Sequence, residues 1–178
     1  MIKRFLVISA GVALLGACGG QEVHAPAPIG NLVRPGAAPW LTVAGGTDKL
    51  EVRGLDHKVI LEPSPDLSTA VQSQLGMQLQ ADYFQDLVVT CTSLTTAMHV
   101  DEDKAPGSVA MNLGLHCAVW SRGLDTNHDY KAEVSTAVAS GAGDEAYAQA
   151  LPKLLADGSS DIAGQLRGDL QKLRHSAH

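Results

Sequence analysis

This 178-residue sequence lacks long apolar runs, basic clusters and the common catalytic motifs. The apolar stretch 5–15 is shorter than the roughly 20 residues that cross a bilayer as a helix. The absence of a Lys/Arg cluster argues against nucleic acid as a partner, and against electrostatic attraction to anionic lipid. No nucleophile elbow, phosphate-binding loop or zinc-protease helix occurs, so we expect neither enzymatic activity nor a cofactor.

The first 17 residues have the layout of a signal peptide, with Lys3 and Arg4 before the apolar run. The run ends in Leu15-Gly16-Ala17-Cys18. This ending resembles the lipobox of bacterial lipoproteins, in which a leucine and two small residues precede an invariant cysteine. The resemblance implies cleavage before Cys18 and attachment of palmitate or similar acyl chains at that cysteine. An ordinary secretory signal cleaved near Ala17 is the alternative.

Acylation at Cys18 would anchor the protein without a membrane-spanning helix, because two or more acyl chains hold firmly where one binds reversibly. Gly19 follows the cysteine. In such lipoproteins an aspartate there often directs retention at the inner membrane, so glycine implies the outer membrane, with the domain facing the periplasm. Cleavage would also remove Lys3 and Arg4. The mature chain would then hold 11 basic residues (13 − 2) and 19 acidic ones, a formal net charge of −8.

The remaining chain divides into a tether and one domain. Residues 18–38 hold the cysteine and a segment rich in Gly, Ala and Pro without an apolar period. This composition predicts a flexible, disordered tether that lets the domain stand off the membrane. Residues 39–178, about 140 in number, are enough to build the core of a single domain.

Three strands in succession are predicted at the centre of that domain, over 87–99, 109–120 and 130–140. The second strand has a strict apolar face on odd positions: Val109, Met111, Leu113, Leu115, Cys117 and Val119. This period of two is what a strand with one buried face requires. Charged and turn-forming residues at 101–107 and 121–128 predict the two connecting loops.

Two cysteines, Cys91 and Cys117, fall on the apolar face of the first two strands. Each lies 13 residues from Lys104, the centre of the first loop. A symmetric antiparallel register therefore places them opposite each other, close enough for a disulfide. Such a bond would add about 3 kcal/mol of stability in the loop-entropy model. Two reduced, buried cysteines are the alternative, although an oxidising periplasm favours the bond.

Helices are predicted on either side of these strands. Ser64-Pro65-Asp66 is a strong helix start, and Leu67, Val71, Leu75 and Leu79 follow at a spacing of four, which predicts an amphipathic helix over 65–80. Residues 144–156 and 161–173 are also helical in pattern, with Pro152 and the break at 157–160 allowing one kinked helix or two stacked ones. The expected fold class is α+β, with an antiparallel sheet containing the three-stranded meander. Both the earlier and the C-terminal helix should pack on one face of that sheet.

This order of elements resembles small outer-membrane lipoproteins of the YajG type, and also the auxiliary lipoproteins of lipid ABC transporters. The strand-to-helix passage at 59–75, VILEPSPDLSTAVQSQL, carries part of the likeness. The first resemblance implies a non-catalytic scaffold that assists a protein partner in the cell envelope. The second implies a lipid- or ligand-binding accessory with an apolar groove between helix 65–80 and the sheet.

Metal sites are weakly indicated. Asp125, Asn127 and Asp129 match the start of a calcium loop, but Tyr130 replaces its glycine and Thr136 its final glutamate, so a polar hairpin turn is the expected structure. His99, Asp101 and Asp103 are expected at a solvated loop rim, and no metal is expected. The glutamines of helix 65–80 should form its exposed face.

Overall fold

The computed structural model describes residues 22–36, 38–79, 86–121, 123–139 and 143–176. The predicted signal peptide and Cys18 lie outside these ranges. The elements are, in order, β1 (Glu22–Pro28), η1 (Gly30–Leu32), β2 (Leu41–Gly45), β3 (Leu50–Arg53), β4 (Lys58–Ser64), α1 (Leu67–Gln78), β5 (Val88–His99), β6 (Ser108–Ser121), β7 (Leu124–Ala137) and α2 (Glu145–Ser176).

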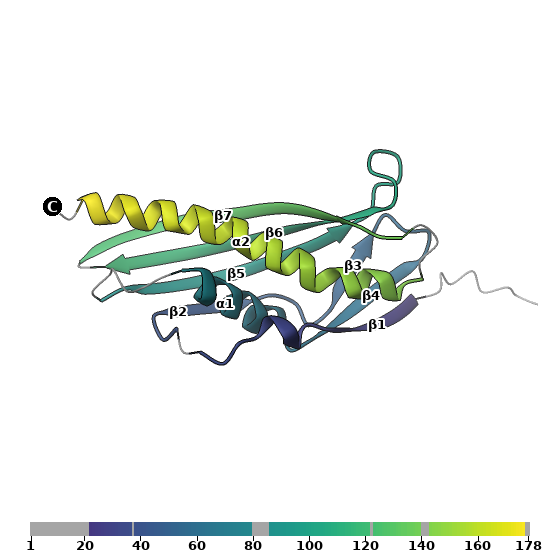
Figure 1. Ribbon diagram of the computed structural model, residues 1–178, viewed down its shortest axis with the longest axis horizontal. Helices are drawn as coiled ribbons and strands as arrows, with labels where there is room; N and C mark the ends of the chain where they lie inside the picture. Colours follow the sequence, from purple (N-terminus) through teal and green to yellow (C-terminus); the bar gives the residue numbers. More distant parts are fainter. Residues whose placement is uncertain (1–21, 37, 80–85, 122, 140–142, 177–178) are drawn as a thin grey trace, which may run out of the picture.

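One seven-stranded sheet holds all the strands, in the order β1-β4-β3-β5-β6-β7, with β2 paired to β5 beside β3 (Figure 1). An α+β fold is therefore confirmed, but the expectation of an antiparallel sheet is wrong. The pairs β1–β4, β2–β5 and β3–β5 are parallel. Between β3 and β5 the chain passes through β4 and α1, which is long enough to return it to the same end of the sheet, as parallel pairing requires.

The three longest strands, β5, β6 and β7, are consecutive antiparallel neighbours. A β-bulge interrupts β5 between Thr92 and Thr95, where Ser93 has a φ of 57°. Gly114 of β6 lies opposite Thr95, and a Cβ at that glycine would be 2.6 Å from the Thr95 hydroxyl oxygen. The bulge shifts the register by one residue. Strand pairing is therefore symmetric about Lys104 only over residues 88–92 of β5, the part that contains Cys91.

Strand β1 contradicts the predicted tether, because residues 22–32 are folded. Its seven residues pair in parallel with β4, and Ala25 and Ala27 are buried in the core. Pro26 and Pro28 alternate with these alanines. Proline is tolerated in an edge strand because its missing N–H faces away from the neighbouring strand. The small buried residues and the prolines conceal a period-two pattern, so the composition alone indicates disorder.

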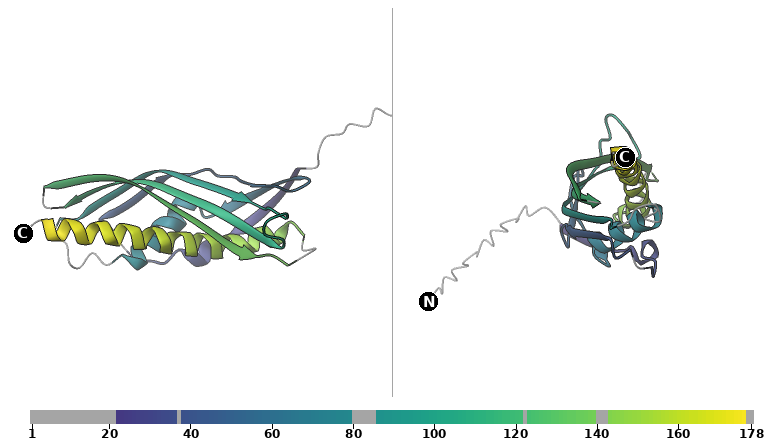
Figure 2. Two further views of the ribbon diagram at one scale, coloured as in Figure 1. Left: turned by 90° about the horizontal axis from the view of Figure 1, so that it is seen from above. Right: turned by 90° about the vertical axis from the view of Figure 1, so that its left-hand side faces the viewer.

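Two helices lie on one side of the sheet (Figures 1 and 2). Helix α1 begins after Asp66, whose carboxylate accepts a 2.8 Å hydrogen bond from the Thr69 N–H, so Asp66 rather than Ser64 caps the helix. Helix α2 is a single helix of 32 residues that includes Pro152 and Gly158. A Cβ at Gly158 would lie 3.2 Å from the Leu113 side chain, so the glycine lets α2 approach β6 closely.

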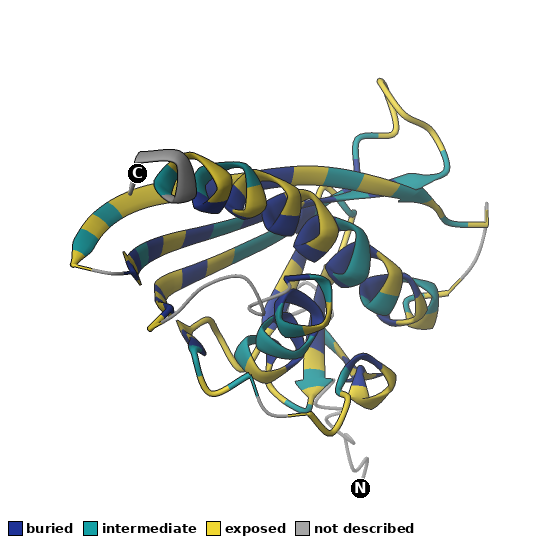
Figure 3. Cartoon of the chain, turned by 60° about the vertical axis from the view of Figure 1, so that its left-hand side comes forward, coloured by how far each residue is buried: buried dark blue, intermediate teal, exposed yellow. Residues whose placement is uncertain are grey.

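The core lies between these helices and the inner face of the sheet (Figure 3). Its fully buried side chains come from both layers. They include Leu67, Val71 and Leu75 of α1, Leu151, Leu154, Leu155 and Leu166 of α2, and Val89, Met98, Met111, Leu113 and Val119 of the sheet. Neither helix in the described chain combines the length and apolarity that a bilayer crossing needs.

Candidate interaction surfaces

Cys91 and Cys117 lie directly opposite each other in β5 and β6, as predicted. Their sulfur atoms are 2.05 Å apart, at covalent bonding distance. Both residues are fully buried on the inner face of the sheet. A disulfide in this position joins two neighbouring strands of the core, and its burial shields it from reactants in solution.

The candidate calcium ligands Asp125, Asn127 and Asp129 are not in a turn. They lie on the exposed side of β7, which begins at Leu124, so the predicted loop 121–128 is wrong in extent. Strand geometry directs alternate side chains outward in parallel and does not bring them together around an ion. Asp129 instead accepts a 2.7 Å hydrogen bond from Nδ1 of His116 on β6. Across the described ranges no three His, Cys, Asp or Glu residues are arranged to hold a metal.

The loop-rim residues close the β5–β6 turn. Asp101 accepts a hydrogen bond of 3.1 Å from the Lys104 N–H, and its carboxylate also pairs with the Lys104 ammonium at 3.1 Å. Lys104 holds the pKa of the Asp101 carboxyl below its usual range. Asp103 is exposed, and His99 ends β5. These contacts shape the turn and converge on no ligand position.

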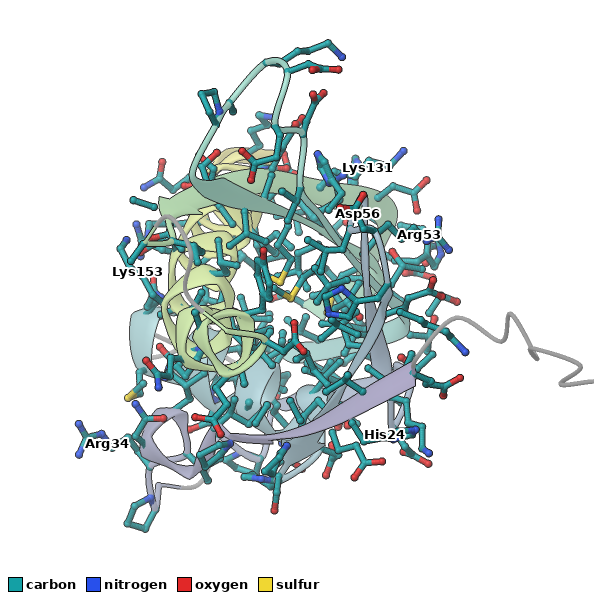
Figure 4. The ribbon with its side chains drawn as sticks, turned by 90° about the vertical axis from the view of Figure 1, so that its right-hand side faces the viewer. His24, Arg34, Arg53, Asp56, Lys131 and Lys153 are labelled. Carbon is teal, nitrogen blue, oxygen red and sulfur yellow. A yellow bond between two sulfur atoms is a disulfide. The ribbon has the colours of Figure 1, made fainter. Side chains whose placement is uncertain are left out.

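The outer face of the sheet carries a network of charged side chains on β1 and β4. Glu22 pairs with Lys58 at 2.8 Å, and the His24 ring lies between Glu22 at 3.0 Å and Glu62 at 2.8 Å. Lys58 first, and His24 second, hold the pKa of Glu22 below its usual range. His24, Arg53 and Lys131 all project from this side in Figure 4, opposite Lys153 of α2. Most of this face is thus solvated and polar.

Two apolar side chains interrupt that polar face at one end. Val88, at the start of β5, lies opposite Trp120, near the end of β6. Their side chains are 46% and 43% exposed. Among the described residues, only Met77 of α1 is another large hydrophobic residue with comparable exposure. Trp120 falls on an even position of a strand whose odd positions are apolar, and this signal is present in the sequence although it was not among the predicted sites.

The predicted apolar groove between α1 and the sheet is absent from the described chain, because the inner face of α1 is packed into the core. A groove of about 340 Å³ lies instead on the outer side of α1, against residues 33–36 and 38. Arg34, Thr69, Ser73 and Met77 contribute to its walls. No ion pair or hydrogen bond of the Arg34 guanidinium occurs within the part of the chain that is described, and Figure 4 shows this side chain extending away from the body.

Two glutamines of α1 are structural rather than part of an exposed face. The Gln74 amide is buried and donates a 2.7 Å hydrogen bond to the Leu32 carbonyl of η1. Gln72 accepts a 3.0 Å hydrogen bond from the Val43 N–H of β2. These contacts fix the N-terminal segments to α1, and they correct the expectation that the glutamines face solvent.

A buried tyrosine links the last strand to the last helix. The Tyr130 hydroxyl of β7 donates a 3.1 Å hydrogen bond to Asp169 of α2. Burial, and then the neighbouring carboxylate, raise the pKa of Tyr130 above its usual value. Gln165 of α2 also donates a 2.8 Å hydrogen bond to the Lys131 carbonyl. Helix α2 is therefore hydrogen-bonded to β7, the last strand of the sheet.

Comparison with known proteins assigns no family. No family model matches the chain, and no curated protein matches it. A crystal structure of an uncharacterized protein is similar, with 12% identity and a TM-score of 0.40, covering 82% of this chain and 92% of the other. Protein XCC0632 from Xanthomonas campestris, of family DUF330, is also similar, with 11% identity and a TM-score of 0.39, covering 84% of this chain and 88% of the other. These likenesses are too weak to establish a shared function.

Proposed function

We propose that this protein is a lipid-anchored protein of the bacterial envelope that assists a protein complex without catalysing a reaction. The observation that carries the proposal is the exposed Val88–Trp120 pair on an otherwise mostly polar sheet face. Exposed tryptophan is costly in water and is over-represented among residues that dominate protein–protein binding energy. The pair would therefore form the centre of a partner interface.

The anchor and the compartment rest on the cysteines. The sequence Leu15-Gly16-Ala17-Cys18 supports acylation at Cys18, with the mature protein at the outer membrane and facing the periplasm. The directly opposed, buried positions of Cys91 and Cys117 support a structural disulfide and with it an oxidising compartment, since such bonds are rare in reducing ones. Both observations favour an envelope protein, of the class that includes the YajG-type lipoproteins.

Site-specific photo-crosslinking in cells tests the partner interface. p-Benzoylphenylalanine replaces Trp120 in one strain and, as the matched control, Lys131 on the same outer face in another. We expect a discrete adduct of defined mass from position 120 only, and its loss when Val88→Asp is added. Circular dichroism of the purified variants checks that each is folded. The same adducts from both positions, or no adduct from position 120, would contradict the proposal.

A second candidate is a ligand-binding accessory of a lipid transport system, and the groove beside α1 favours it. The Arg34 guanidinium could bind a phosphate or carboxylate, while Met77 offers apolar contact to an attached chain. Titration calorimetry with a single-chain phospholipid below its micelle concentration tests this. Arg34→Ala should weaken binding at least about tenfold, a loss of about 1.4 kcal/mol. Arg53→Ala, a matched loss of an exposed arginine, should leave binding unchanged.

A further inference from the structure

The distance from the lipid anchor to the folded domain is short. Strand β1 begins at Glu22, so only Gly19, Gly20 and Gln21 separate it from Cys18. Four fully extended Cα–Cα steps span at most about 14 Å. The folding of residues 22–32 into the domain thus removes most of the tether that the composition predicted, and it limits how far the start of β1 can lie from an anchored Cys18.

The strand register shows which end of the domain this anchor would hold. Glu22 pairs with Lys58, which directly follows the β3–β4 turn. Across the sheet, Arg53 at the other side of that turn pairs with His99, and His99 pairs with Ala110, next to the β5–β6 loop. His57 of the turn also lies 2.8 Å from Asp144, just before α2. We call this the anchored end.

The Val88–Trp120 pair lies at the opposite end, where Trp120 also pairs with Asp125 at the start of β7. Strand β6 connects the two ends, and the 12 steps from Ser108 to Trp120 (120 − 108), at a rise of about 3.3 Å each, span roughly 40 Å. Figures 1 and 2 show the start of β1 and the C-terminal end of α2 at opposite ends of the long axis. The tether is therefore far too short for the domain to turn over and place the Val88–Trp120 end where the anchored end lies.

The anchored end is acidic and presents no large exposed hydrophobic residue among those described. Its carboxylates are Glu22, Asp56, Asp101, Glu102, Asp103, Asp144 and Glu145, against the cations Arg53, Lys58 and Lys104. An acidic surface is repelled by anionic lipid, and without apolar side chains it has no means of insertion. A domain held this way is anchored beside the headgroups by its short tether alone.

We propose that the domain stands upright on the membrane, with the β3–β4 turn and the β5–β6 loop facing the phospholipid headgroups. The Val88–Trp120 end is then presented roughly 40 Å away, where a partner distant from the bilayer can reach it. The proposal rests on acylation at Cys18. A domain lying on its outer sheet face would instead bring Trp120 to the lipid interface.

Fluorescence quenching in vesicles tests the orientation. The acylated full-length mature protein receives a fluorophore at Asp103→Cys or at Asp125→Cys. Each substitution removes one exposed aspartate, and the two lie at opposite ends. The vesicles contain phosphatidylethanolamine and phosphatidylglycerol with a short-range nitroxide quencher on a fraction of the headgroups. We expect quenching at position 103 to exceed that at position 125 several-fold, and an insertion of 20 Gly/Ser residues after Gly20 to abolish most of the difference.

The outcomes separate the orientation from the anchor. Flotation with vesicles, followed by equal quenching at both positions or stronger quenching at 125, would overturn the upright orientation while leaving acylation intact. Failure of the protein purified from cells to float, with mass spectrometry showing an unmodified Cys18, would overturn both the anchor and the orientation that depends on it. A persistent difference after the Gly/Ser insertion would show that a surface contact, not the tether, orients the domain, and would overturn the tether as the cause.

Discussion

Cys91 and Cys117 occupy directly opposed positions in β5 and β6, with their sulfur atoms 2.05 Å apart and both side chains fully buried. The bond closes a loop with a sequence separation of 26 residues that contains the β5–β6 turn. Both strands lie in the interior of the sheet, with a neighbour on either side, and helix α2 packs on Leu113 of β6. Loss of the bond should therefore lower the stability of the whole domain.

Cys91→Ser and Cys117→Ser should each lower the free energy of unfolding by about 3 kcal/mol, since either change reopens the same loop in the unfolded state. The double substitution should cost no more than the larger single one, because only one bond is lost. Urea denaturation of the three variants measures this. Mass spectrometry without reductant provides the control, and free thiols at both positions in the wild-type protein would exclude the bond.

Tyr130→Phe should lower the free energy of unfolding by about 1–2 kcal/mol at neutral pH, because the hydrogen bond from the Tyr130 hydroxyl to the Asp169 carboxylate is lost. Tyr147→Phe is the matched control. Tyr147 packs against the core, and no hydrogen bond of its hydroxyl occurs in the described ranges. Thermal or urea unfolding should show little change for the control, and equal losses in both variants would argue against a specific bond.

The effect of Tyr130→Phe should depend on pH. Lys172 first, and then Tyr130, hold the pKa of the Asp169 carboxyl below its usual range. A carboxyl whose pKa falls on folding stabilises the protein above its unfolded pKa of about 3.9, and this contribution is lost as the pH falls through the folded value. The stability difference between wild type and variant should thus be constant near neutrality and narrow below about pH 4. Urea titrations at several pH values measure it.

Gly54→Ala should lower the free energy of unfolding by about 1–3 kcal/mol or more, because φ is 88° there and a Cβ would lie 2.1 Å from the Val100 carbonyl oxygen. Gly164→Ala is the opposite case. This glycine lies in α2, and a Cβ added to it would have no neighbouring atom within 4 Å, so alanine should stabilise the helix by up to about 1 kcal/mol. Denaturation midpoints that move in the same direction for both variants would contradict this prediction.

Sequence patterns predicted the local features of this fold well. The period-two face of residues 109–120 located β6, and loop symmetry placed Cys91 opposite Cys117. The same register, extended away from the loop, pairs Val88 with Trp120. The candidate partner surface could therefore also have been predicted from the sequence. These features depend on neighbours in a hairpin, where alternation and loop length determine which side chains meet.

Features set by distant contacts could not be predicted in the same way. The parallel pairing of β1 with β4 joins segments separated by 36 residues, and the buried residues of β1 are small alanines between prolines. The bulge at Ser93 lies where β5 pairs with β2 on one edge and β6 on the other, and both pairings change register there. The groove beside α1 is lined by residues 33–36 and 38 together with the helix, so it too depends on a contact between separate segments. None of these arrangements produces a distinctive local period.

Cys18→Ala should release the protein from the membrane fraction, because the acyl chains that are proposed to hold it there can no longer be attached. Membrane flotation followed by immunoblotting measures the distribution in cells. Trp120→Ala serves as the matched control: it removes the exposed indole but leaves Cys18 intact, so this variant should remain with the membranes. If Cys18→Ala stayed membrane-associated and Trp120→Ala were released, the apolar pair would be the membrane contact. The upright orientation would then be wrong, because a separation of roughly 40 Å from the anchored end is incompatible with Trp120 reaching the bilayer.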